Sequence, residues 1–168
     1  MRSLTDFLRE IDASSGELSA TVIQFRASVT AAAAVSYPTD GPGQTFTLSE
    51  EYVYFITELR AGFTLAGLTE NAGTADTLYA DVDDFRFNIK DSGSGKDLFD
   101  TDVELNTLVS GDGKSTPISF APSGWAIRAG ATLKLTVTMR DTAITRARVV
   151  TPQLVCIKVP KGYSLKAS

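Results

Sequence analysis

The chain has 168 residues and a formal net charge of −4, and its length fits one globular domain. Because 43% of the residues are hydrophobic and 21% are charged, the composition excludes disordered and fibrous classes. Histidine is absent and Cys156 is the only cysteine, which excludes an intrachain disulfide, Ser-His-Asp and Cys-His catalysis and the usual catalytic zinc sets. No apolar run approaches the roughly 18 residues of a membrane span, so no signal peptide, anchor or membrane partner is expected.

The first predicted element is a short amphipathic helix over Ser3–Ile11, with Ser3 as its N-cap. Its apolar stripe at helical spacing consists of Leu4, Phe7, Leu8 and Ile11. A helix this short is marginal alone, so we expect the stripe to dock, either on its own domain or on a neighbouring subunit. The chain is therefore divided into an N-terminal helical arm (residues 1–16), a β-sandwich domain (17–160) and a polar tail (161–168).

Strand patterns dominate the next part of the chain. Thr21–Tyr37 alternates apolar and polar residues, with a bend or break expected in its alanine run. Pro38–Gly43 is dense in proline and glycine and predicts a loop. Tyr52–Leu59 is aromatic and β-branched enough to be a strand covered on both faces, and Phe63–Leu68 predicts a shorter strand. The polar stretch Thr69–Thr77 predicts a surface loop that is suited to contacts.

The C-terminal half continues this pattern. Leu78–Lys90 and Arg148–Pro160 predict strands, and Pro152 indicates that the second is bulged or at a sheet edge. The longest clean alternation lies in Gly124–Asp141, where Gly130 suits a turn. The residues expected on its buried side are Leu133, Leu135, Val137 and Met139. Short strands with Gly/Pro turns predict an all-β fold, an antiparallel β-sandwich or jelly roll with a short N-terminal amphipathic helix.

Three residue groups were candidates for chemistry. Two aspartate sets carry oxygen ligands suited to calcium but lack the EF-hand pattern, so a solvated rim is the preferred interpretation; they are Asp76, Asp81, Asp83 and Asp97, Asp100, Asp102. Trp125 and the tyrosines Tyr52, Tyr54 and Tyr79 could form a sugar-stacking platform, but alternating strand positions favour core packing. Cys156 is expected in the core. We predict no catalytic residue, no metal site and no cofactor.

Charge is distributed unevenly along the sequence. Between Asp76 and Asp102 the sequence contains eight acidic and three basic residues. Between Arg128 and Ser168 it contains eight basic residues, and Asp141 is the only acidic one. The asymmetry fits scattered solvated faces, or acidic and basic faces that meet between copies. The late basic residues are not interleaved with exposed aromatics and the chain is acidic overall, so no nucleic-acid partner is expected; they include Lys134, Arg140, Arg146, Arg148 and Lys158.

One part of the sequence resembles a known group of proteins. Residues 87–91 form a Phe-x-Ile-x-Asp strand before a glycine turn, and residues 127–133 read Ile-x-x-Gly-x-x-Leu, following Pro122, before a long strand. This succession, over roughly Phe85–Val159, resembles jelly-roll structural proteins of tailed bacteriophage virions. The resemblance implies an accessory virion component, foremost a capsid decoration or cement protein. Such a protein is made in the host bacterial cytoplasm and resides on the capsid surface.

The resemblance also implies partners, namely further copies of the chain, with a trimer favoured, and the major capsid protein or other virion proteins. We predict the helix stripe and two loop regions as contact surfaces. The loop residues are Tyr37, Pro38, Asp40, Pro42, Asn71 and Asp76. Two alternatives stay open. One is a carbohydrate-binding jelly-roll module on a tail fibre or an attached enzyme, with Trp125 exposed; the other is a different accessory protein of the head or tail.

Overall fold

The computed structural model describes residues 19–29, 36–38, 45–65, 82–110, 113–120, 125–139 and 148–160. The predicted helix Ser3–Ile11 and the tail over residues 161–168 lie outside this set, so their boundaries stay predictions. The described strands are β1 (Ser19–Gln24), β2 (Ala27–Val29), β3 (Ser36–Pro38), β4 (Thr45–Thr47), β5 (Tyr52–Leu65), β6 (Phe85–Asp91), β7 (Lys96–Asp97), β8 (Val103–Glu104), β9 (Ile118–Ser119), β10 (Trp125–Ile127), β11 (Thr132–Met139) and β12 (Arg148–Pro160), with 3-10 turns η2 (Val82–Asp84) and η3 (Leu105–Thr107).

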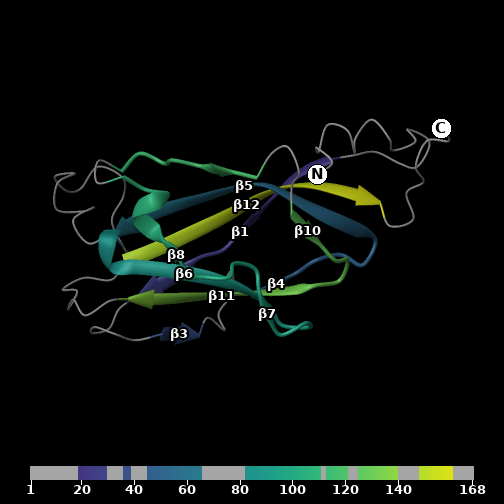
Figure 1. Ribbon diagram of the computed structural model, residues 1–168, viewed down its shortest axis with the longest axis horizontal. Helices are drawn as coiled ribbons and strands as arrows, with labels where there is room; N and C mark the ends of the chain where they lie inside the picture. The colour runs from purple at the N-terminus through teal and green to yellow at the C-terminus, as the bar shows by residue number, and fades with distance from the viewer. Residues whose placement is uncertain are drawn as a thin grey trace.

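The strands form two antiparallel sheets, each built on two long central strands. In the β5–β12 sheet, β1 and β2 pair with β12, while β9 and β10 pair with β5. In the β6–β11 sheet, β3 and β4 pair with β11, while β7 and β8 pair with β6. Figure 1 shows the two long pairs running lengthwise through the molecule. The predicted antiparallel β-sandwich is confirmed.

The pairing pattern is that of one long β-hairpin that wraps around the core to form both sheets. When the short strands are grouped as β1/β2, β3/β4, β7/β8 and β9/β10, the described part of the chain has eight strand positions. The first pairs with the eighth, the second with the seventh, the third with the sixth and the fourth with the fifth. Wrapping this hairpin brings β12 beside β5 and β11 beside β6. This is a jelly roll, in which the sheet edges are short strands that offer little template for unwanted pairing.

The core lies between the two sheets and follows the predicted alternation of β11. Leu133, Leu135, Val137 and Met139 are buried, and the residues between them are half-buried, as expected. Phe85, Phe87 and Ile89 of β6 and Leu154 and Cys156 of β12 join the same core cluster. Gly130 has a φ of +69° before β11 and confirms the predicted turn.

The strand boundaries expected between Tyr52 and Leu68 are corrected. Tyr52–Leu59 and Phe63–Leu68 were expected as separate strands, but β5 runs unbroken from Tyr52 to Leu65. Its inward side changes from Tyr54 and Ile56 to Leu59 because the register with β12 shifts beside Thr57. The hydroxyl of Thr57 donates to the Val155 carbonyl, 3.2 Å away, which fixes the irregularity.

Pro152 does not lie at a sheet edge, which was one of the two interpretations that the sequence allowed. β12 is central, and its pairing with β5 continues in register through Pro152↔Ala61. On the other side of β12, the gap between β1 and β2 lies opposite the proline, where the Phe25 amide donates to the Pro152 carbonyl at 2.9 Å. A residue's amide and carbonyl point to the same side of a strand, so the donor that proline lacks would have faced this gap.

Candidate interaction surfaces

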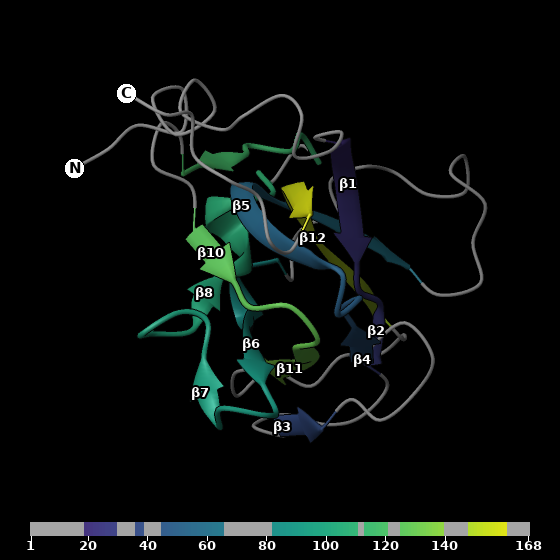
Figure 2. The same cartoon turned by 90° about the vertical axis from the view of Figure 1, so that its right-hand side faces the viewer.

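An aromatic cluster lies at the β10 edge of the β5–β12 sheet, and Figure 2 shows β10 on the same side of the sandwich as β7 and β8. It consists of Trp125 on β10, Phe120 after β9 and Phe99 after β7, and we call it the aromatic flank. Trp125 lies two residues before buried Ile127 on the edge strand β10, so both side chains project to the inner side of the sheet. Trp125 is nevertheless 42% exposed. Its predicted place in the core is therefore wrong, because the sheets do not close over this edge.

The ring geometry leaves part of the indole accessible. Phe99 and Phe120 are stacked at a centroid distance of 6.5 Å and an angle of 22°. Trp125 lies 5.9 Å from Phe99 at 72° and 6.1 Å from Phe120 at 65°. Both contacts are of the edge-to-face type, and they leave Trp125 42% exposed. Trp125 is thus held by packing and still presents an apolar surface.

A polar network holds Phe99 in this position. Asn88 of β6 is buried, and its side-chain amide donates to the Phe99 carbonyl at 3.0 Å and to Asp102 Oδ1 at 3.3 Å. Arg86 adds an ion pair to Asp102, with 3.4 Å between Nε and Oδ2. Buried hydrogen bonds from a side-chain amide are costly to break, so the loop that supports the aromatic flank is fixed to β6.

A second polar contact joins the β6–β7 turn to the approach to β11. Arg128 Nε donates to Asp91 Oδ2 at 3.0 Å, and Arg128 Nη2 donates to Asp91 Oδ1 at 3.1 Å. The Gly93 amide also donates to Asp91 Oδ1, at 3.0 Å. The hydrogen bond from Arg128 is the main cause that lowers the pKa of Asp91 to about 2, against burial, which raises it. This pair also neutralises charge between the predicted acidic and basic segments.

The outside of the β5–β12 sheet carries a second apolar surface. Opposite residues of an antiparallel pair project to the same face, and Ile23, Ile56, Leu154 and Ile127 face inward. Their neighbours therefore face outward and lie in two rows across the sheet, Ala20–Ile157–Phe55–Ala126 and Val22–Val155. We call these six residues the outer apolar face. Ala20, Val22 and Ala126 are exposed, Val22 at 53%, and the other three are half-buried.

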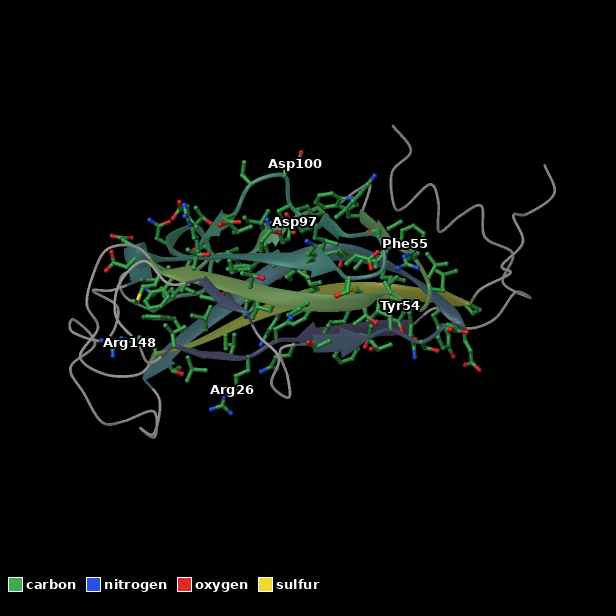
Figure 3. The ribbon with its side chains drawn as sticks, turned by 90° about the horizontal axis from the view of Figure 1, so that it is seen from below. Arg26, Tyr54, Phe55, Asp97, Asp100 and Arg148 are labelled. Atoms are coloured by element: carbon green, nitrogen blue, oxygen red, sulfur yellow. The ribbon has the colours of Figure 1, made fainter. Side chains whose placement is uncertain are left out.

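In one direction along the strands the outward positions become polar, because Glu58 lies opposite Val155 and forms an ion pair with Arg60, which lies opposite Gln153. In the other direction the next outward pair is Val53 and Val159, and Val159 is buried. Figure 3 labels Phe55 and Tyr54 on neighbouring positions of β5. Tyr54 is buried, whereas Tyr52 is half-buried and lies under the Lys158 ammonium, 4.5 Å from its ring centroid. The tyrosines of β5 therefore form no exposed platform.

Reactive groups do not gather in the part of the chain that the structure describes. No group of three or more His, Cys, Asp or Glu residues there could hold a metal ion. Asp97 and Asp100 are exposed on one side of the sandwich, opposite the side from which Arg26 projects (Figure 3). Cys156 is buried in the core, as predicted, and this burial raises the pKa of its thiol to about 12. No helix among the described residues is long and apolar enough to cross a bilayer.

The predicted contact residues fall mainly outside the described set. Tyr37 and Pro38 lie on β3, opposite Val137 and Thr136 at an edge of the β6–β11 sheet. The other predicted contacts lie outside the described residues, namely Leu4, Phe7, Leu8, Ile11, Asp40, Pro42, Asn71 and Asp76. Sequence reasoning missed the outer apolar face, although the double-sided apolar pattern of Tyr52–Leu59 was a signal for it. The outer apolar face was not among the predicted contacts, whereas Trp125 of the aromatic flank was named in the saccharide-binding alternative.

Comparison with known proteins adds one likeness. No protein-family model and no curated protein matches the chain. A solved structure, described as the cyanophage Pam1 capsid asymmetric unit, contains a similar chain with 16% sequence identity and a TM-score of 0.44. The match covers 89% of this chain and 89% of the other. The chain is thus similar to a chain of that capsid asymmetric unit.

Proposed function

We propose that this protein is a non-enzymatic virion structural protein, specifically a capsid decoration or cement protein that oligomerises and binds the major capsid lattice. The jelly-roll topology and the resemblance of Phe85–Val159 to virion jelly rolls support the class. The observation that carries the proposal is the outer apolar face, because an antiparallel sheet that faces only water alternates apolar residues inward and polar residues outward. Apolar residues outside a completed sandwich favour association.

The contacts of such a protein act through shape and area. A standard specific interface buries about 1,600 Å² in total, and repeated contacts on a lattice add avidity. We assign the predicted helix stripe to contacts between copies. We assign the loops that follow Tyr37 and precede η2, with Asp40, Pro42, Asn71 and Asp76, to contacts with the capsid lattice. Tyr37 and Pro38 support this assignment because β3 is a short edge strand.

Two measurements test the proposal. Light scattering of the purified chain gives its oligomer mass, for which a trimer is expected. Cosedimentation with phage heads that lack the protein then tests lattice binding, and saturable binding at a fixed number of copies per head is expected. A monomer that does not bind heads would contradict the proposal. Deletion of Met1–Ser15 is expected to abolish assembly or attachment while circular dichroism still shows a folded β domain.

A second candidate function is saccharide binding, which the exposure of Trp125 specifically favours. An indole with a free face stacks on the apolar side of a sugar ring, as aromatic residues do in jelly-roll lectins. Intrinsic fluorescence tests this candidate because Trp125 is the only tryptophan. Saccharide-dependent, saturable changes in its emission would support sugar binding, whereas emission that no saccharide changes would leave Trp125 as a protein contact.

A further inference from the structure

The outer apolar face has the dimensions of a docking site for a short helix. Its longer row crosses four strands, from Ala20 on β1 to Ala126 on β10. Strands lie about 4.8 Å apart, so three gaps make the row about 14 Å wide. A nine-residue helix is about 13.5 Å long. The predicted helix Ser3–Ile11 has this length, and its stripe consists of large apolar residues that need a partner surface.

The chain leaves the sandwich next to this face. β1 begins at Ser19, opposite Lys158, and Ala20 is the next residue and belongs to the longer row. Seven residues, Asp12–Leu18, join the predicted helix to β1. An extended chain spans up to about 3.4 Å per residue, so this connector reaches roughly 24 Å, farther than the row is wide. The connector is therefore long enough for the helix to cross its own outer apolar face, or to reach that of a copy lying within this distance.

We propose that the outer apolar face of one copy binds the Ser3–Ile11 segment of a neighbouring copy. The choice of a neighbour rests on the proposed function, because a segment docked on its own sheet covers both the helix stripe and the outer apolar face and leaves neither for contacts between copies. In this arrangement, each copy gives its Ser3–Ile11 segment to one neighbour and binds the segment of a neighbour on its own outer apolar face. This is a head-to-tail contact, which closes into a ring when the rotation between copies allows it.

Cysteine pairing between two full-length variants tests this arrangement. Cys156 is buried, so it does not compete with an introduced surface thiol. One variant carries Leu8→Cys and a mass tag, and the other carries Val22→Cys. After mixing and mild oxidation, intact mass and non-reducing gels are expected to show disulfide-linked heterodimers. The matched control is Phe46→Cys, because Phe46 is 40% exposed but lies on β4 of the other sheet, and it is expected to give no heterodimer.

The double variant Leu8→Cys/Val22→Cys provides the opposing result. Intrachain disulfides in this variant, without heterodimers in the mixture, would show that the segment docks on its own sheet and would overturn the inference. Absence of both products, or equal yields with Phe46→Cys, would also overturn it. Light scattering separates this failure from that of the proposed function, since a stable oligomer without the cross-link refutes only the docking inference.

Charge substitutions give an independent readout. Leu8→Glu places a charge in the predicted stripe, whereas Thr5→Glu adds the same charge outside it. We expect Leu8→Glu and Val22→Glu to shift the chain to lower mass in light scattering, and Thr5→Glu and Thr47→Glu, which changes an exposed outward residue of β4, to leave the mass unchanged. An oligomer that tolerates Leu8→Glu as well as Thr5→Glu contradicts the inference.

Discussion

On the outside of the β6–β11 sheet, β11 presents Lys134, Thr136 and Thr138, and the β6 residues opposite them are also polar, namely Lys90, Asn88 and Arg86. On the outside of the β5–β12 sheet, β12 presents Val155 and Ile157, with Ala20, Val22, Phe55 and Ala126 beside them. Both sheets contribute to the same core, so burial inside the sandwich does not explain the contrast. A sheet that faces water carries polar outward residues, whereas the β5–β12 sheet has the pattern of a strand pair covered on both sides.

The largest expected difference between inward and outward positions is on β12. Leu154 is completely buried, so Leu154→Ala should lower the free energy of unfolding by about 2–5 kcal/mol. Val155 faces outward, so Val155→Ser should lower it by less than about 1 kcal/mol in the dissociated chain but weaken self-association. Urea unfolding at low protein concentration, with light scattering at high concentration, measures both effects. Equal losses of stability would show that Val155 is a core residue.

Acid should selectively weaken the β6–β11 side of the molecule. The pKa of Asp91, about 2, lies below its usual value, so its stabilising contribution is complete above roughly pH 4 and is lost as the pH falls through about 2. Asp91→Asn should cost about 1–2 kcal/mol at pH 7, less than the full pKa shift implies, because Arg128 is half exposed and solvent screens the pair. Asparagine keeps the oxygen that accepts from Gly93.

The control for this prediction is Asp97→Asn, since Asp97 is an exposed carboxyl on the adjacent strand β7. Unfolding curves between pH 2 and pH 7 should converge for the wild type and Asp91→Asn near pH 2. If the two curves stay parallel over that range, the Asp91–Arg128 pair does not cause the pH dependence.

A smaller effect is expected where the chain enters β11. Gly130 adopts a φ of +69°, and a Cβ atom there would lie 3.0 Å from Glu50 Cγ. Gly130→Ala should therefore destabilise the fold by about 1–2 kcal/mol, because side chains clash in the left-handed region. Gly130→Asn should cost less, since asparagine tolerates this conformation better. Thermal unfolding of the three proteins checks the order, and an alanine variant as stable as the wild type would contradict it.

The smallest change is expected from thiol reagents. The Cys156 thiol is buried in the β5–β12 sheet and its pKa is raised to about 12, so at pH 8 the folded chain should not react with a disulfide reagent. The same reagent should modify the thiol promptly in urea. Rapid reaction in buffer alone would show that the inward side of β12 opens readily to solvent.

The parts that sequence predicted best are those where a single chain segment determines the outcome. The alternation of β11, its Gly130 turn and the buried Cys156 follow from local pattern and were predicted correctly. The continuation of the strand Tyr52–Leu59 as far as Leu65 was not predicted, because the register shift beside Thr57 changes the inward side within β5. Periodicity alone reads such a change as a strand break.

The surfaces could not be predicted because they depend on pairing between distant segments. Trp125 alternates like a core residue, and only its place on the edge strand β10 leaves it exposed. Pro152 signals an edge in any single strand, and only the gap between β1 and β2 makes it acceptable in a central one. The outer apolar face is assembled from four strands that are far apart in sequence, so no local window contains it.

The folded-back hairpin also determines where the sandwich begins and ends. Ser19, the first residue of β1, lies opposite Lys158, two residues before β12 ends at Pro160. Both ends of the β domain therefore lie at one corner, on adjacent strands. A short glycine-rich linker could join them, and new termini could then be opened elsewhere in a circularly permuted chain. The same corner would present a fused peptide or enzyme at either end in nearly the same place, which makes the domain suited to carrying foreign cargo.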